Sequence, residues 1–350
     1  MKLYNQRKII NEQTKHAGAV VNCMLCLFFY SMIADKTSCH FDKINAKKDV
    51  FNRFVSYNEG NSDQGKERFK MKIAVMTDST AYIPKDIREK HHIYMLPLSV
   101  MFDDATYQEE IDITTEEFYS KLRNASQLPK TSQPSIGYIT EKLEELAMTY
   151  DAVISVHLSS GISGTYSAVK SAGEMVEGID VYAYDSELSC MGQGSYVLEA
   201  VQMVENGKTP EEILDRFEYI KKSIRAYFIV DNLRNLHRGG RLNGAQALIG
   251  SMLQVKPILH FVNKLIVPFE KIRTRKKAIH RIWGMLEDDI ASGGEYKAII
   301  IHGNDRETAE ELQTQLSEDH PSVETSISYF GPVIGTHLGE GAIGICWYKK

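Results

Sequence analysis

Hydrophobic and polar residues alternate along the chain in blocks that predict strands followed by helices. Three short runs rich in apolar and β-branched residues each end in a polar turn: IAVMTDST at 73–80, AVISVHLSSG at 152–161 and DVYAYDSE at 180–187. Longer segments with apolar residues at helical spacing lie between and after these runs. The alternation predicts an α/β domain over residues 71–222, with a parallel or mostly parallel sheet between helices. The expected helices span 85–91, 115–124, 139–150, 166–176 and 191–206.

The pattern changes after a further predicted helix at 210–222, and residues 223–350 predict an α+β domain with a mixed sheet. Two apolar runs, KPILHFV and KLIVPFE, are joined by Asn263 and Lys264. They predict a β-hairpin, because Asn accepts the positive φ of a tight turn. The remaining expected elements are a strand at AYFIVDNL, helices at 245–254, 275–292 and 306–318, a strand at YKAIIIHG, and two strands around a Gly-rich loop in TSISYFGPVIGTHLGEGAIGICWY.

The first 70 residues follow neither pattern. An apolar stretch at 17–34 comes after several basic residues and superficially matches a signal peptide or a short membrane anchor. Residues 35–70 are polar, and the strand pattern then begins abruptly at Met71. The codons for residues 65–70 can spell a purine-rich AAGGAG ribosome-binding sequence just before that Met. We therefore expect residues 1–70 to be a non-native or disordered extension of a cytoplasmic protein that has no stable membrane insertion.

Composition and charge narrow the possible classes of function. The 350 residues are 43% hydrophobic and 25% charged, which fits a soluble protein of roughly two domains. A net charge of −5 gives no electrostatic reason to expect nucleic acid as a partner. The five cysteines are unevenly spread and form no disulfide framework. Cys23 and Cys26 form a Cys-x-x-Cys pair without a second pair at zinc-site spacing, so we expect no metal.

Hydroxyl groups gather in three segments that follow predicted strands or turns, where ligands of open α/β sheets bind. The first is TDST at 77–80, which can serve a ligand or cap a helix. The second is TSQPS at 131–135, where Ser132 or Ser135 can start the next helix. The third is SSGISGTY at 159–166, between a buried strand and a helix. Its small residues let backbone N–H groups and hydroxyls converge on a carboxylate or a phosphate.

The third segment argues against two classes of enzyme. The hydrolase elbow Gly-x-Ser-x-Gly fails because Thr165 stands at its last position, and no P-loop lysine follows.

Basic residues in 238–241 and 273–277 are most simply interpreted as solvated faces. Arg273 and His337 differ in lying beside Pro or Gly turns at strand ends, where a cation and a neutral imidazole could meet an acid group across a domain cleft.

Five motifs occur in order along the chain: TDST, TSQPS, SSGISGTY, LHRGGR at 236–241 and GPVIGTHLG at 331–339. Together they resemble the DegV family of bacterial fatty-acid-binding proteins, over residues 72–349. The resemblance implies a two-domain α/β fold, with a parallel-sheet domain at 71–222 and a mixed-sheet domain at 223–350. It also implies a long-chain fatty acid as ligand, with its tail buried and its carboxylate in the domain cleft.

The resemblance further implies which residues bind the carboxylate. The TSxPS motif carries over as Thr131 and Ser132, and the SSxxSGT motif as Ser163, with Gly164 supplying its backbone. A histidine near the carboxyl end of the family's chains carries over as His337.

The resemblance also implies a partner protein. Family members present the fatty acid to a separate kinase catalytic subunit, which phosphorylates the carboxylate to an acyl phosphate for phospholipid synthesis. Arg273 carries over as the residue important for this kinase. The carrier then needs no cofactor and no nucleotide site, in keeping with the lack of a Walker motif.

Two alternatives use the same residues. A serine esterase or acyltransferase would pair Ser163 with His337, and an ester substrate or a covalent serine probe would reveal it. A regulatory module would use the bound lipid as a signal to a protein partner. The sequence alone does not separate a carrier from a sensor.

Overall fold

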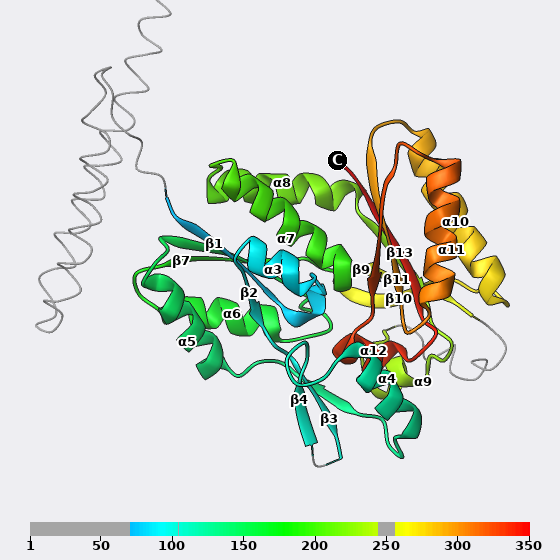
Figure 1. Cartoon of the computed structure of the whole chain (residues 1–350), viewed down its shortest axis with the longest axis horizontal. Helices are drawn as coiled ribbons and strands as arrows, with labels where there is room; N and C mark the ends of the chain where they lie inside the picture. The colour runs from blue at the N-terminus through cyan, green and yellow to red at the C-terminus, as the bar shows by residue number, and fades with distance from the viewer. Residues whose placement is uncertain (1–70, 104, 244–255) are drawn as a thin grey trace, which may run out of the picture. The chain divides into compact units, whose positions relative to one another are not determined.

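The computed structural model describes residues 71–103, 105–243 and 256–350. The helix expected at 245–254 and everything expected of residues 1–70 lie outside these ranges. Within them, no helix is both long enough and apolar enough to cross a membrane. The described chain contains sheets of four, six and three strands (Figure 1).

The four-stranded sheet is entirely parallel, as predicted, with the strand order β2-β1-β6-β7. Its central strands β1 and β6 are buried at every position. Parallel sheets are covered on both faces, and this is why these strands are continuous apolar runs in the sequence. The strands span Ile73–Asp78 (β1), Ile93–Leu96 (β2), Ala152–His157 (β6) and Asp180–Asp185 (β7).

Helices cover both faces of this sheet. Ala74 and Met76 face a cluster with α5 (Ile136–Ala147) and α6 (Thr165–Gly173). The alternate residues of β1 face α7 (Cys190–Glu205) and α8 (Pro210–Ser223). Ser135 caps α5 by accepting the N–H of Tyr138 at 3.3 Å, so this helix begins before the expected residue 139. A short helix, α3 (Lys85–Lys90), connects β1 to β2.

The six-stranded sheet is mixed, as predicted, with the order β10-β9-β8-β13-β11-β12. The predicted hairpin joins β9 to β10, and Asn263 and Lys264 both have positive φ, at 48° and 73°. One face of the sheet packs on α10 (Arg275–Ala291) and α11 (Arg306–Asp319). The strands span Arg225–Ile229 (β8), Ile258–Val262 (β9), Leu265–Glu270 (β10), Tyr296–His302 (β11), Glu324–Tyr329 (β12) and Ile343–Lys349 (β13).

A three-stranded antiparallel sheet was not anticipated. It has the order β4-β3-β5 and packs on α4 through Phe118 and Tyr119. Thr131 and Ser132 are the last residues of its short strand β5, and Ser135, not Ser132, begins the next helix. The elements span Ser99–Phe102 (β3), Ala105–Gln108 (β4), Thr115–Asn124 (α4) and Lys130–Ser132 (β5).

The Gly-rich segment between β12 and β13 is likewise not a simple loop, because it contains the helix α12 (Pro332–Leu338). Proline is favoured at the first position of a helix. Gly335 allows the helix to pack closely on α4, since a Cβ at this position would lie 2.8 Å from Phe118 Cε1 and from Tyr119 Oη.

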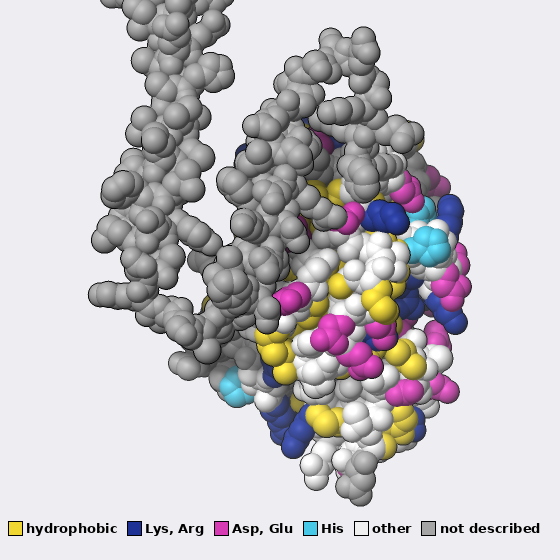
Figure 2. All heavy atoms as spheres, turned by 90° about the vertical axis from the view of Figure 1, so that its left-hand side faces the viewer, with side chains coloured by type: hydrophobic (Ala, Val, Ile, Leu, Met, Phe, Trp, Pro, Cys, Tyr) yellow, Lys and Arg dark blue, Asp and Glu magenta, His cyan; other side chains and the backbone are white. Residues whose placement is uncertain are grey.

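The main hydrophobic cluster joins the parallel sheet to the mixed sheet. Helix α7 contacts strands of both sheets, and Tyr196, Val197 and Ala200 on this helix are buried. The four-stranded sheet is formed by residues before 222 and the six-stranded sheet by residues after it, although a division into two domains stays a prediction. On the face shown in Figure 2, acidic, basic and hydrophobic side chains of the described residues are interspersed.

Candidate functional site

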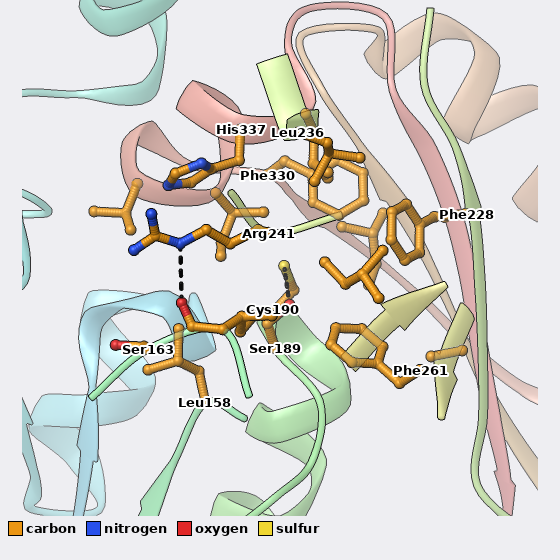
Figure 3. A pocket seen from close by; sticks show the side chains of 18 of the residues that line it. Leu158, Ser163, Ser189, Cys190, Phe228, Leu236, Arg241, Phe261, Phe330 and His337 are labelled. Carbon is orange, nitrogen blue, oxygen red and sulfur yellow. Dashed lines mark hydrogen bonds between the residues drawn. The ribbon is translucent and has the colours of Figure 1, made fainter. Parts of the chain in front are cut away.

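A cavity of about 290 Å³ lies between the loop that follows β6 and the mixed sheet. Its two ends differ in chemistry. Ser163, Arg241 and His337 lie toward one side in Figure 3, whereas the rings of Phe228 and Phe261 lie toward the other. The polar lining residues are Thr131, Ser132, Gln133, Ser163, Ser189, Arg241 and His337, and the apolar ones include Leu98, Leu158, Ile162, Phe228, Leu236, Phe261, Ile266, Ile301, Phe330, Val333, Ile334 and Leu338.

The cavity brings together Thr131, Ser132, Ser163, Gly164 and His337, all of which were expected to bind the ligand. We call Thr131, Ser163, Arg241 and His337 the head-group site. Arg273 does not line the cavity.

Arg273 is exposed in the segment between β10 and α10. His337 lines the cavity and Arg273 does not, so a joint contact of the two with one acid group stays a prediction.

His337 and Thr131 are in direct contact although 206 positions separate them. The distance between Thr131 Oγ1 and His337 Nε2 is 2.9 Å. Burial, together with the positive charge of Arg241, lowers the pKa of His337 to about 4. The imidazole is therefore neutral near pH 7 and carries one N–H. If Nε2 carries it and donates to Thr131, the threonine hydroxyl is left to donate its own proton into the cavity.

Ser163 and Gly164 lie at the start of α6. Ser163 Oγ is 2.9 Å from Thr165 Oγ1 and accepts the N–H of Thr165 at 3.3 Å. Gly164 is the N-cap of α6, and no side chain caps the helix there. Its lack of a side chain also lets Gln133 approach, because a Cβ on Gly164 would lie 2.2 Å from Gln133 Oε1. The other N–H groups in the first turn of α6 have no partner within the helix and can receive an anion.

Arg241 is the principal residue that the sequence did not reveal. Its Nε donates to the carbonyl of Ile162 at 3.1 Å (Figure 3). Its Nη1 donates to the carbonyl of Gly239 at 2.5 Å. The guanidinium thus reaches the loop that carries Ser163. The interpretation of residues 238–241 as a solvated face holds for the exposed Arg238 and is wrong for Arg241. The signal in the sequence that could have revealed Arg241 is the glycine pair before it, because such a pair favours a turn, and Gly240 has a φ of 71°.

The hairpin between β9 and β10 fixes the loop that carries Ser163. Ser159 Oγ donates to the carbonyl of Lys264 at 2.6 Å, and Lys264 Nζ forms an ion pair with Asp185 at 2.9 Å. Gly161 packs directly on the hairpin turn, since a Cβ there would lie 2.3 Å from the carbonyl oxygen of Lys264. Phe261 on the same hairpin lines the apolar end of the cavity. The contact between the hairpin and the loop that carries Ser163 therefore positions residues at both ends of the cavity.

The TDST motif supports the structure and does not reach the cavity. Asp78 caps the 3₁₀ turn η1 (Ser79–Ala81) by accepting the N–H of Thr80 at 3.1 Å. Burial opposes ionisation of Asp78, but hydrogen bonds, first of all from His157, lower its pKa. Asp78 also accepts the N–H of Leu158 at 3.0 Å, and Leu158 lines the cavity.

Comparison with known proteins identifies the family. The family model described as "Uncharacterised protein, DegV family" matches residues 72–350. The chain belongs to the DegV family. Protein DegV of Bacillus subtilis strain 168 is 57% identical over 281 residues, covering 80% of this chain and 100% of that protein. A DegV domain-containing protein of Listeria innocua is 52% identical over 280 residues, covering 80% and 99%.

Solved DegV structures share the fold. The crystal structure of Bacillus subtilis DegV, described as a fatty acid binding protein, has a TM-score of 0.77 at 56% identity and covers 80% of this chain and 100% of its own. A fatty acid binding DegV family protein of Streptococcus agalactiae has a TM-score of 0.74 at 33% identity, covering 80% and 99%. The predicted fold class, with a parallel sheet followed by a mixed sheet, is confirmed.

In this DegV family member, Ser163 and His337 are not hydrogen-bonded to each other as the catalytic pair of a serine hydrolase would be. A nucleophilic serine needs its general base within hydrogen-bond reach. Here His337 Nε2 contacts Thr131, and Ser163 Oγ contacts Thr165. Within the described ranges, no group of three or more His, Cys, Asp or Glu residues is arranged to hold a metal ion.

Proposed function

We propose that this DegV family chain binds a long-chain fatty acid and presents its carboxylate to the catalytic subunit of a fatty acid kinase. The observation that carries the proposal is the cavity itself: hydroxyls, an imidazole and a guanidinium at one end, and aromatic and aliphatic side chains at the other. The Bacillus subtilis and Streptococcus agalactiae relatives, both described as fatty acid binding, support the same ligand class.

The two ends of the ligand would contribute differently to binding. A carboxylate leaving water needs several donors, and each charge-assisted hydrogen bond contributes roughly 1.5–3 kcal/mol. Thr131, Ser163 and Arg241 can supply them. Each methylene group of the tail contributes about 0.8 kcal/mol on burial. A long tail therefore supplies most of the affinity, and the head-group site sets which end faces outward.

The position of the polar end suits presentation to a partner. Ser132, Gln133 and Gly164 line this end of the cavity and are exposed to solvent. A carboxylate held there lies near the surface, where a second protein that carries ATP can reach it. This argues for a carrier in which the chemistry belongs to the partner.

A reconstituted reaction tests the carrier function. The chain, the kinase catalytic subunit, ATP with Mg²⁺ and oleate are mixed with hydroxylamine, which converts an acyl phosphate to a stable hydroxamate. We expect hydroxamate only when all components are present. Hydroxamate formed without the chain would contradict the carrier role, and hydrolysis of an ester by the chain alone would favour the esterase.

We further propose that Arg273 contacts the kinase and not the fatty acid. It is exposed and does not line the cavity, whereas its neighbour Arg275 is paired with Asp305. Arg273→Ala should lower the rate of acyl phosphate formation and leave oleate affinity unchanged. Lys276→Ala, at an exposed position of α10, is the matched control. A loss of oleate affinity in Arg273→Ala would contradict this assignment.

A further inference from the structure

A buried carboxyl group outside the cavity contacts the helix that carries His337. Glu109 follows β4, is 0% exposed and is not among the residues that line the cavity. It belongs to none of the motifs that predicted the site. Because burial of a carboxyl group is costly unless its oxygens are hydrogen-bonded, the contacts of Glu109 explain its position.

Three donors converge on Glu109. Oε1 accepts the backbone N–H of Val333 at 2.7 Å and the hydroxyl of Tyr82 at 2.9 Å. Oε2 lies 2.6 Å from Ser79 Oγ. The Tyr82 hydroxyl in turn accepts the N–H of Ile334 at 3.2 Å. Two consecutive backbone N–H groups of α12 thus bond to Glu109 and to its partner Tyr82.

These contacts replace the missing cap of α12. The N–H groups in the first turn of a helix have no partner within the helix. The N-cap residue Gly331 has no side chain and makes no capping hydrogen bond. Glu109 and Tyr82 satisfy two of these groups from outside the helix. Since the bonds have fixed directions, they set both the position and the rotation of α12.

The rotation of α12 determines where His337 points. Val333 and His337 are four residues apart, lie on the same face of the helix and both line the cavity. His337 Nε2 is the atom that reaches Thr131. We propose that Glu109 is a positioning residue of the head-group site, which holds the first turn of α12 so that His337 meets Thr131. The effect on ligand affinity rests on the proposed function.

The protonation of Glu109 suggests the most informative variant. Burial raises its pKa to about 8, although the hydrogen bonds from Ser79, Val333 and Tyr82 oppose this rise. In the protonated form Oε1 still accepts two donors, and the Oε2 hydroxyl can donate to Ser79. A glutamine reproduces this pattern with its carbonyl oxygen and its amide N–H. Glu109→Gln is therefore the conservative variant, and Glu109→Ala removes the contacts.

Calorimetric titration with oleate tests the proposal. We expect Glu109→Ala to bind about 10-fold more weakly than the wild type and Glu109→Gln to stay within about 3-fold. In a His337→Ala background, Glu109→Ala should change affinity by less than about 2-fold, because the group it positions is absent. An equal loss in both backgrounds, or a Gln variant as weak as the Ala variant, would overturn the proposal.

Two further variants keep the test independent of stability. Tyr82→Phe removes the hydroxyl that accepts the N–H of Ile334, and we expect a loss of about 3-fold that disappears in the His337→Ala background. Leu316→Ala creates a cavity in the cluster between α11 and the mixed sheet, away from α12. It should leave oleate affinity within about 2-fold. A larger loss there would mean that general destabilisation weakens binding, and would overturn the specific role of Glu109.

The ring nitrogen signals of His337 give a readout that needs no ligand. In ¹⁵N NMR spectra of the ligand-free protein, assigned with His337→Ala, we expect these signals to shift in Glu109→Ala and to stay in place in Glu109→Gln. Unchanged signals in Glu109→Ala would overturn the positioning role. If the wild type failed to bind oleate, the proposed function would fall, and these spectra would still decide the role of Glu109.

Discussion

Arg241→Met tests the contribution of the guanidinium to ligand binding. The substitution keeps an unbranched apolar side chain and removes the positive charge at the polar end of the cavity. It also removes the hydrogen bonds to the carbonyls of Ile162 and Gly239. Arg238→Met is the matched control, because Arg238 lies three residues earlier and is exposed.

The expected loss follows from the type of bond. A charge-assisted hydrogen bond to a carboxylate contributes about 1.5–3 kcal/mol, which corresponds to about 10- to 150-fold in affinity. Arg241→Met should therefore weaken oleate binding by a factor in this range, whereas Arg238→Met should leave it unchanged. Methyl oleate has no carboxylate, so its affinity should fall much less in Arg241→Met than that of oleate.

The same variant should change the titration of His337. The pKa of His337 is lowered to about 4 by burial and by the charge of Arg241, so removing that charge should raise the pKa. NMR titration of the ring measures this shift, and binding is measured by calorimetry. Equal losses for oleate and methyl oleate, or an equal effect of Arg238→Met, would refute the role of the guanidinium in holding a carboxylate.

Three further predictions concern the loop, the hairpin and the buried acid. Ser163→Ala should weaken oleate binding by about 10-fold with little change in melting temperature, and unchanged affinity would reject its role. Gly161→Ala places a Cβ 2.3 Å from the carbonyl oxygen of Lys264 and should lower the melting temperature by at least about 2 °C, whereas Gly137→Ala, with open space around it, should not. The pKa of Glu109 is raised from 4.5 to about 8, so its contribution to stability is complete below pH 4.5 and is lost as pH rises through 8. Urea unfolding from about pH 6 to about pH 9 should therefore show Glu109→Gln gaining stability relative to the wild type, and a constant difference would contradict the shift.

The regular elements could be predicted from the sequence because their burial is periodic. Strands β1 and β6 are buried on both faces and read as apolar runs, and the turn at Asn263 and Lys264 carries its own conformational signal. The three-stranded sheet was not predicted because its strands are only three or four residues long, which is too short to show an alternation of apolar and polar residues. Helix α12 was not predicted because the three glycines and one proline at 331–339 suggest a loop, while the stability of the helix comes from contacts with distant residues.

The candidate site was partly predictable for a similar reason. The hydroxyls at Thr131 and Ser163 stand out in short polar segments next to predicted strands. The contact between Thr131 and His337 joins residues 206 positions apart, and nothing in the local sequence indicates it. In the sequence Arg241 resembles the exposed Arg238. In the structure the turn at Gly239 and Gly240 directs Arg241 toward the cavity. The burial of Glu109 could not be predicted, because a single glutamate in a polar stretch normally faces solvent.

The central claim is that the cavity holds a fatty acid, and native mass spectrometry tests it most directly. The protein is purified from its own cells under mild conditions, and its mass is compared before and after denaturation in organic solvent. We expect an added mass that leaves on denaturation, matches a long-chain fatty acid and is strongly reduced in the Arg241→Met variant. A protein without such a mass, or one that carries a ligand without a carboxylate, would contradict the account.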